Sequence, residues 1–178
     1  MISDFVKGKK KFDYPEGIQK GIALHRAIDT FTDGHELIQL AKQYFRPDYR
    51  LYSGALVDVV FDHFLATDMD SFLKVSLFDF ASSVYSTLEQ YDQFFPSRFA
   101  LMFPLMKRQN WLYGYRLLSG AEKSIGGVVH RAAYISHPEP AIEILKLHYQ
   151  PLQDLFRQFW PDLRSFAFEQ WTILKGKG

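Results

Sequence analysis

Apolar residues recur at the spacing of an α-helix along nearly the whole sequence, and this repeat constrains the fold more than any other feature. Between residues 15 and 32 the apolar positions include Ile18, Ile22, Ile28 and Phe31. Residues three or four apart lie on one face of a helix. The alternation of apolar and polar residues that indicates half-buried strands is scarce. The sequence therefore predicts an all-α fold.

The same pattern predicts further helices in the rest of the chain. They cover residues 35–45, 52–66, 70–95, 99–107, 111–118, 121–134 and 140–171. Asp70 is the expected N-cap of the 70–95 helix, and Pro96 is expected to end it. We expect Pro151 and Pro161 to kink or break the last helix, because proline removes a helical hydrogen bond.

Length and composition exclude several classes of protein. The 178 residues suit one domain, residues 1–178, with a sizeable core, and the absence of cysteine excludes disulfides, iron–sulfur clusters and thiolate ligands for zinc. The 21 Lys and Arg nearly balance the 20 Asp and Glu, so the overall charge favours neither nucleic-acid nor membrane binding. No apolar run approaches the roughly 20 residues of a membrane span, and no signal peptide is recognisable, so we expect a cytoplasmic protein.

The stretch "GIALHRAIDTFTD" places an imidazole and carboxylates among apolar residues. His25, Asp29 and Asp33 follow one another at intervals of four residues. Positions four apart are offset by only roughly 40° around a helix, so these side chains share one strip. Ile18 and Ile22 fall on the same strip, which therefore faces inward. A carboxylate there is costly unless it is paired or binds a metal ion.

The stretch "DVVFDHF" repeats this theme on another predicted helix. Asp58 and Asp62 are four residues apart, His63 follows directly, and Ala55 and Leu65 share the strip of the two aspartates. Two such helices packed together would supply two imidazoles and several carboxylates. These nitrogen and oxygen donors suit Mn²⁺ or Fe²⁺ best, with Zn²⁺ and Mg²⁺ as alternatives.

Simpler roles stay open for these and other residues. A His–Asp pair on one helix more often forms a hydrogen bond or ion pair than a metal site. Asp33 could cap the next helix, with His35 in that turn, and Asp58 could support a histidine rather than bind metal. The stretch "RQNWLYGYR" could clamp a phosphorylated group or form a packed aromatic corner. The stripe containing Met102 and Met106 is expected to be core.

Five stretches, taken in order and spacing, resemble one protein family. They are "SDFVKG", "GIALHRAIDTFTDGH", "DVVFDHFLA", "RQNWLYGYR" and "FWPDL", and they cover nearly the whole chain. In these stretches the sequence resembles the acyl carrier protein phosphodiesterases. That family is regarded as a divergent branch of the HD-domain phosphohydrolases, which are all-helical metal enzymes. The resemblance therefore implies an HD-domain-like bundle.

The resemblance also implies a reaction. The phosphodiester that joins 4′-phosphopantetheine to a serine of holo-acyl carrier protein would be hydrolysed, giving apo-carrier protein, with Mn²⁺ as the expected ion. The ion would lower the pKa of a bound water, which would attack phosphorus as the serine alkoxide leaves. Asp33 or Asp58 would orient the water or supply the proton. The implied metal ligands are Asp4, His25, Asp29, Asp62 and His63.

Acyl carrier proteins are strongly acidic, so the resemblance implies a basic docking surface. The lysine run is a candidate, with a solvated loop as the alternative. It comprises Lys7, Lys9, Lys10 and Lys11. Further candidates for substrate contacts are Arg26, Arg116 and Arg131.

The sequence departs from the family pattern in two ways. HD proteins place His before Asp, whereas the adjacent pair here is Asp62–His63. Family members also usually begin with an apolar segment containing a histidine, ahead of the motif that matches Ser3–Gly8. If that histidine is a ligand, we expect weaker metal binding here.

Two other functions stay open. One is an HD-type phosphohydrolase of a nucleotide-like phosphoester. The other is a non-catalytic helical module that binds carrier protein, with its acids and imidazoles paired to each other or to arginines such as Arg26.

Overall fold

The structure is a computed structural model that describes residues 2–72, 75–132 and 137–176. Within these ranges the regular elements are all helical, which confirms the predicted all-α fold. The α-helices are α1 (Glu16–Gly34), α2 (Glu36–Tyr49), α3 (Ser53–Phe72), α4 (Leu77–Glu89), α5 (Ser97–Arg108), α6 (Trp111–Gly114), α7 (Leu118–Arg131), α8 (Glu139–Leu147) and α9 (Tyr149–Lys175). Short 3-10 helices are η1 (Ile2–Phe5), η2 (Gly8–Asp13), η3 (Arg50–Tyr52) and η4 (Asp92–Phe94).

The main core lies where α2, α3, α7, α8 and α9 pack together. Its fully buried side chains include Phe45 of α2, Phe64 of α3 and Ile125 of α7. Burying each such side chain contributes about 1.5–3 kcal/mol. Helix α3 packs against α2, α7 and α9, so it is apolar around most of its circumference. None of the described helices is both long enough and apolar enough to cross a membrane.

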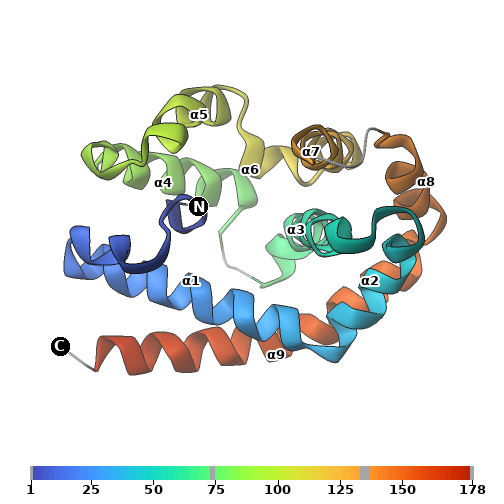
Figure 1. Ribbon diagram of the computed structural model, residues 1–178, viewed down its shortest axis with the longest axis horizontal. Coiled ribbons are helices and arrows are strands. Elements are labelled where there is room, and N and C mark those ends of the chain that lie inside the picture. The colour runs from blue at the N-terminus through green and yellow to red at the C-terminus, as the bar shows by residue number, and fades with distance from the viewer. Residues whose placement is uncertain (1, 73–74, 133–136, 177–178) are drawn as a thin grey trace.

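A second, smaller core joins α4 and α5 to the N-terminal segment. Phe99, Phe103 and Met106 of α5 are buried against Tyr85 of α4, which confirms the apolar stripe predicted there as core. Phe5 of η1 packs on Phe99, with 5.8 Å between ring centroids. In Figure 1 these helices form a layer on the far side of the N-terminal segment from α1 and α9.

Helix α1 runs antiparallel to α9 along one side of the molecule (Figure 1). Phe31 of α1 stacks on Phe166 of α9, with ring centroids 4.3 Å apart. The opposite side of α1 carries the N-terminal segment, because the Arg26 guanidinium donates to the carbonyls of Val6 at 2.7 Å and Gly8 at 3.5 Å. One face of α1 is thus packed, while the face with the polar strip is left largely to solvent and the N-terminal segment.

Two of the predicted helices are wrong in their boundaries. The single helix over 70–95 is two helices: α3 continues past Asp70, and α4 starts at Leu77, where the Ser76 hydroxyl accepts from the Asp79 amide at 3.2 Å. The helix over 140–171 breaks at His148 rather than at either proline. Pro151 lies in the first turn of α9, where its missing amide costs no helical bond.

Other ends differ by a few residues. Helix α2 passes through Pro47 to Tyr49 instead of stopping at residue 45. The reason is tertiary: the buried Tyr49 hydroxyl donates to the His137 carbonyl at 2.7 Å and accepts from the Ala141 amide at 2.9 Å. The predicted helix over 111–118 ends at Gly114 as α6, and α7 begins earlier than expected. The expected end of that helix at residue 134 lies outside the described residues.

Candidate acidic site between α1 and α3

The two predicted rows of polar side chains lie on α1 and α3, two helices that Figure 1 shows in neighbouring parts of the molecule. Negative charge on Asp33 and Asp29 of α1 raises the pKa of Asp58 on α3, and Asp58 in turn raises the pKa of Asp62. Charges influence one another this way only at short range. These charge effects link Asp29, Asp33, Asp58 and Asp62, which we call the acidic site.

Within the α1 row, His25 lies between two carboxylates. Its Nδ1 is 3.0 Å from Oδ2 of Asp29, and its Nε2 is 3.5 Å from Oδ1 of Asp4. All three side chains are partly or fully open to solvent, so each contact contributes little, about 0–1 kcal/mol. Three of the predicted metal ligands are thus close together, joined by hydrogen bonds and ion pairs.

Asp33, at the end of this row, pairs with a lysine of the next helix. Its Oδ1 is 3.0 Å from Nζ of Lys42. The alternative in which Asp33 caps α2 is wrong, since Asp33 lies inside α1 and His35 is the N-cap: Nδ1 of His35 accepts from the Leu37 amide at 3.3 Å. The other ring nitrogen of His35 is 3.4 Å from Asp162. The Asp33 side chain is therefore available to the acidic site.

The α3 row carries the most perturbed carboxylates. Burial raises the pKa of Asp62 to about 7, and the charge of Asp58 adds to this. Burial raises the pKa of Asp58 to about 6, with Asp33 and Asp29 adding and Lys42 opposing. Each of these residues nevertheless keeps exposed surface, and Asp58 lines a pocket. No basic side chain of the described residues forms an ion pair with either carboxylate.

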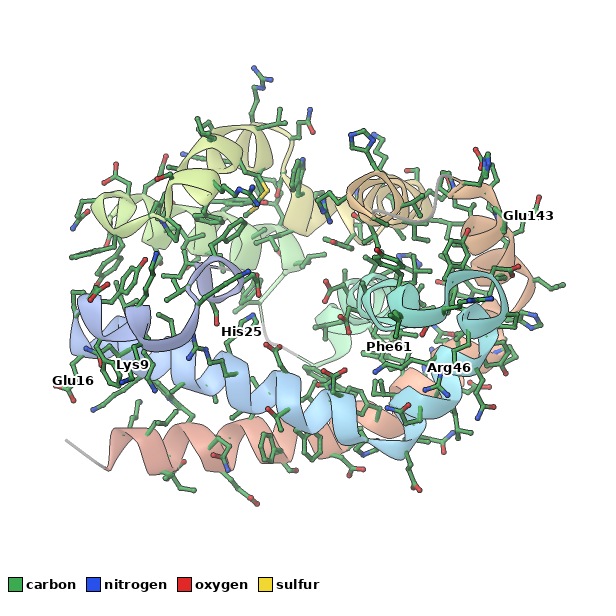
Figure 2. All side chains as sticks on the ribbon, in the orientation of Figure 1. Lys9, Glu16, His25, Arg46, Phe61 and Glu143 are labelled. Atoms are coloured by element: carbon green, nitrogen blue, oxygen red, sulfur yellow. The ribbon has the colours of Figure 1, made fainter. Side chains whose placement is uncertain are left out.

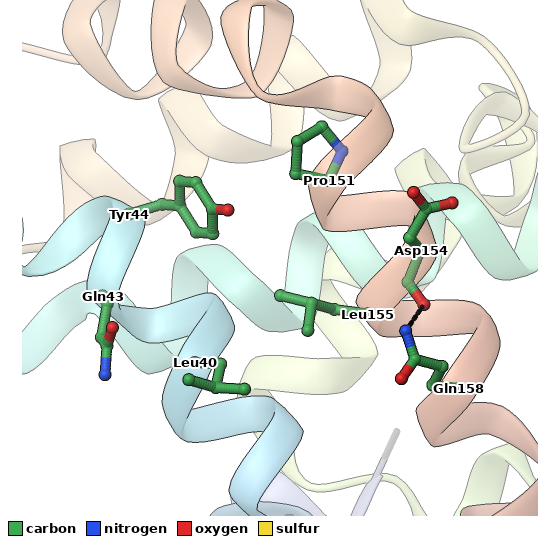
Figure 3. Close-up of a pocket in the computed structure, with 7 residues that line it drawn as sticks. All are labelled: Leu40, Gln43, Tyr44, Pro151, Asp154, Leu155 and Gln158. Atoms are coloured by element: carbon green, nitrogen blue, oxygen red, sulfur yellow. Dashed lines mark hydrogen bonds between the residues drawn. The ribbon is translucent and has the colours of Figure 1, made fainter.

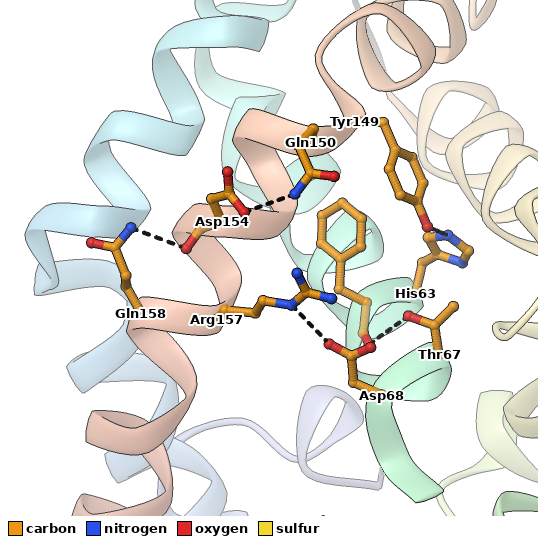
Figure 4. A network of polar contacts seen from close by, with 9 residues as sticks. His63, Thr67, Asp68, Tyr149, Gln150, Asp154, Arg157 and Gln158 are labelled. Atoms are coloured by element: carbon orange, nitrogen blue, oxygen red, sulfur yellow. Dashed lines mark hydrogen bonds and ion pairs between the residues drawn. The ribbon is translucent and has the colours of Figure 1, made fainter. Parts of the chain in front are cut away.

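His63 points elsewhere, although it follows Asp62 directly. It is 2% exposed, with Nδ1 2.6 Å from the Tyr115 carbonyl and Nε2 2.9 Å from the Tyr149 hydroxyl (Figure 4). A carbonyl only accepts, which assigns the proton to Nδ1 and makes Nε2 the acceptor of the hydroxyl. Adjacent helical residues are roughly 100° apart, so His63 enters the core while Asp62 faces the site. A ligand role for His63 stays a prediction that requires one of these bonds to break.

Tyr115 borders the acidic site and was not singled out from the sequence. Burial raises the pKa of its hydroxyl, the charge of Asp62 raises it further, and both a hydrogen bond to Ser124 and the charge of Arg131 oppose the rise. The charges of Asp62 and of the predicted substrate contact Arg131 therefore both act on Tyr115. Its only sequence signal was its place within "RQNWLYGYR".

That stretch forms the packed aromatic corner offered as one alternative. Tyr113 meets Phe78 edge-on with ring centroids 5.4 Å apart, and the Arg116 guanidinium lies 4.1 Å from the Tyr113 ring centroid. Gly120 packs against the Gly114 carbonyl so closely that a Cβ there would lie 2.1 Å from the oxygen. The corner holds Tyr115 in place, and Arg116 lies on its outside.

The predicted lysine run lies on and beside η2. Lys7, Lys9 and Lys10 are exposed, and Lys11 is partly buried, with Nζ 5.0 Å from the Phe12 ring centroid. The Arg26 side chain, predicted to contact substrate, holds this segment through main-chain carbonyls. The run is a solvated surface in this structure, and its docking role stays a prediction.

Two pockets open near α2. One, of about 740 Å³, adjoins the acidic site and is lined by Asp33, Asp58, Lys42, Arg46 and Arg50 among others. These three basic residues carry no motif in the sequence and were not predicted to belong to a site. The other, of about 400 Å³, lies between α2 and α9 away from both rows (Figure 3).

A preassembled metal centre is not evident. Among the described residues no three His, Asp or Glu side chains are gathered closely enough to hold an ion. The donor chemistry still fits a divalent cation, because carboxylate oxygens and an imidazole suit Mn²⁺, Fe²⁺, Mg²⁺ or Zn²⁺. A cation would also offset the mutual repulsion that raises the pKa of Asp58. The metal site stays a prediction.

Comparisons with known proteins identify the family. A profile described as acyl carrier protein phosphodiesterase matches residues 1–163. Proteins with that name from Yersinia pestis and Yersinia enterocolitica are 32% and 30% identical over 168 residues, which is 94% of this chain and 87% of each relative. The Photorhabdus laumondii protein of that name is 30% identical, with 94% of this chain and 85% of the relative covered.

The name that these relatives share denotes a phosphoric diester hydrolase. No solved structure matches the chain, so the HD-domain-like arrangement stays a prediction. The chain belongs to the acyl carrier protein phosphodiesterase family.

Proposed function

We propose that this chain hydrolyses the phosphodiester joining 4′-phosphopantetheine to a serine of holo-acyl carrier protein. The observation that carries the proposal is the acidic site of Asp29, Asp33, Asp58 and Asp62 in a chain of this family. Carboxylates with raised pKa values near neutrality are suited to proton transfer at a cleft. The relatives' shared name supplies the substrate class.

Proton transfer falls to Asp58. Its pKa of about 6 lets the carboxylate accept a proton from an attacking water at neutral pH. Attack on phosphorus breaks the bond to the serine oxygen, and Asp58 then returns the proton to the serine alkoxide. Asp33, which Lys42 holds, faces Asp58 and orients the water.

We also propose that the reaction depends on a divalent cation, with Mn²⁺ as the first choice. The residues that would hold it are His25, Asp29 and Asp62, with Asp4 next to His25. When bound, such an ion lowers the pKa of a water and offsets charge on phosphoryl oxygens. The open placement of these side chains leaves room for them to close around an ion.

A non-catalytic module that binds carrier protein is the second candidate. The observation that favours it is the pairing of His25 with Asp29 and Asp4, since a chain that holds no ion would pair its imidazole and acids in this way. Asp58 and Asp62 argue against a non-catalytic role, because among the described residues no basic side chain forms an ion pair with either of them.

Mass spectrometry of holo-acyl carrier protein tests these alternatives. The carrier protein is incubated with the chain and Mn²⁺, with a chelator in a parallel sample. Loss of the phosphopantetheine mass only with metal supports both proposals, and loss in both samples overturns the metal dependence. No loss, with carrier protein still bound, overturns hydrolysis and favours the binding module. Asp58→Asn should abolish turnover, whereas Glu143→Gln on α8, far from His25 in Figure 2, should not.

A further inference from the structure

We propose that Lys42, Arg46 and Arg50 form the docking site for a carboxylate-bearing surface of the protein substrate, with Leu51 as its apolar contact. This α2–η3 pocket is not part of the lysine run. The inference rests on the proposed function for the identity of the partner, but it can be tested by binding alone.

The pocket opens beside the carboxylates that would act on the substrate. It has a volume of about 740 Å³, and its lining includes Asp33 and Asp58 together with Lys42, Arg46 and Arg50. A protein docked there would place a modified side chain next to the acidic site. The lysine run lies elsewhere: Lys9 and Arg46 are at opposite ends of the molecule in Figure 2.

The two arginines are free of acidic partners within the described part of the chain. Lys42 pairs with Asp33 at 3.0 Å, whereas the Arg46 guanidinium donates to the neutral Gln39 amide oxygen at 2.8 Å. Arg46 and Arg50 are exposed, and no described carboxylate forms an ion pair with either. Positive charge unmatched from within the protein attracts anions and speeds their association.

The backbone at Arg50 has a conformation that glycine would adopt more easily. Its φ is 43° and its ψ is −112°, close to the first central residue of a type II′ turn, where glycine predominates. The Ser53 hydroxyl donates to the Arg50 carbonyl at 2.8 Å, and the Arg50 amide donates to the Arg46 carbonyl. A strained arginine on a ligand-sized pocket points to a role for its guanidinium.

Leu51 favours a protein over a small anion as the occupant. Its side chain is 97% exposed beside Arg50 and lines the same pocket. A free phosphate would need the cations but would gain nothing from an apolar side chain. An acidic protein surface with an apolar residue among its carboxylates uses both.

Charge reversal distinguishes this pocket from the lysine run. The double variant Arg46→Glu and Arg50→Glu should raise KM for holo-acyl carrier protein about 10-fold or more and leave kcat within about twofold, since rim charges act on association. The matched control is Arg164→Glu, an exposed arginine of α9, which should change neither. If Lys9→Glu with Lys10→Glu raises KM and the arginine variant does not, the inference is overturned.

Binding of apo-acyl carrier protein, which lacks the scissile bond, separates docking from hydrolysis. Fluorescence anisotropy should show Kd rising about 10-fold for the arginine variant and about threefold for Leu51→Ala, whatever the outcome of the hydrolysis assay. Arg50→Gly should unfold at the same or a higher temperature and still bind more weakly, which a purely structural role cannot produce. Unchanged Kd in all three variants, or competition by inorganic phosphate without any effect of Leu51→Ala, overturns the inference.

Discussion

The α1 row and the α3 row look alike in sequence but differ in the folded protein. Each has two aspartates four residues apart and a nearby histidine. In α1, His25 contacts two carboxylates at a solvated surface, and Asp33 pairs with Lys42. In α3, the aspartates have raised pKa values, and His63 is buried between Tyr115 and Tyr149.

Packing explains this difference. Helix α1 packs mainly against α9, so its polar strip keeps access to water and to the N-terminal segment. Helix α3 is enclosed by α2, α7 and α9, so its polar side chains are desolvated to different degrees. Desolvation and like charge are the causes that raise the pKa values of Asp58 and Asp62. The same residue types therefore form a solvated network on one helix and a proton-binding pair on the other.

The largest expected effect is on catalytic activity, when an aspartate of the α3 row is replaced. Asp62→Asn should lower kcat/KM for holo-acyl carrier protein by about 100-fold or more, because it removes a carboxyl group of the acidic site whose pKa is about 7. Steady-state assays at pH 7.5 measure this. Glu143→Gln removes one exposed carboxylate from α8 and serves as the control. Equal losses in the two variants would mean that Asp62 has no special role.

Replacing each histidine should lower the stability of the protein by a different amount. His63→Ala should lower the free energy of unfolding by about 2–4 kcal/mol, since it leaves a cavity and strips partners from the Tyr115 carbonyl and the Tyr149 hydroxyl. His25→Ala should cost less than about 1 kcal/mol, because its ion pairs are solvated. Urea denaturation gives both values. Similar costs would contradict the contrast between the helices.

The pH dependence of stability should come from the α3 row. A carboxyl whose pKa is raised on folding contributes stability that is full at acid pH and lost as pH rises through the folded pKa. Asp58 has a pKa of about 6 and Asp62 a pKa of about 7. Together they should lower the free energy of unfolding by about 1 kcal/mol between pH 4 and pH 7, a value kept small because both residues are exposed to solvent.

Urea denaturation of the metal-free protein from pH 4 to 8 measures this slope. The double variant Asp58→Asn and Asp62→Asn should flatten it and be the more stable protein at pH 8. Asp29→Asn should leave most of the slope in place, because Asp29 is the smallest of the influences named on Asp58. A slope that survives in the double variant would assign the effect to other groups.

The smallest expected effect is a shift in the pH–activity profile when Lys42, which links the two rows, is replaced. Lys42 pairs with Asp33 and lowers the pKa of Asp58. Lys42→Met should therefore raise the pKa of Asp58 and move the acid limb of the pH–activity profile to higher pH, by less than about one unit. Lys123→Met, an exposed lysine of α7, should leave the profile in place. A shift to lower pH would contradict the electrostatic link.

Local pattern was enough to predict most of the helices, and the errors in their boundaries have both local and tertiary causes. Helix α1 was predicted within a few residues, because its apolar period is regular and Pro15 precedes it. The boundary near Ser76 was missed because a serine cap, rather than a change in the apolar period, separates α3 from α4. The extension of α2 to Tyr49 depends on contacts of that side chain with His137 and Ala141, which are far away in the chain.

The sequence by itself determined the helical class, the two rows of aspartates and the motifs of the family, because periodicity and short motifs are properties of neighbouring residues. Only the tertiary structure decided that His63 turns into the core, that Tyr115 borders Asp62, and that Arg46 and Arg50 line a pocket beside Asp58. Burial, hydrogen-bond partners and the repulsion between carboxylates all depend on which distant segments pack together. A residue's place on its own helix does not specify them.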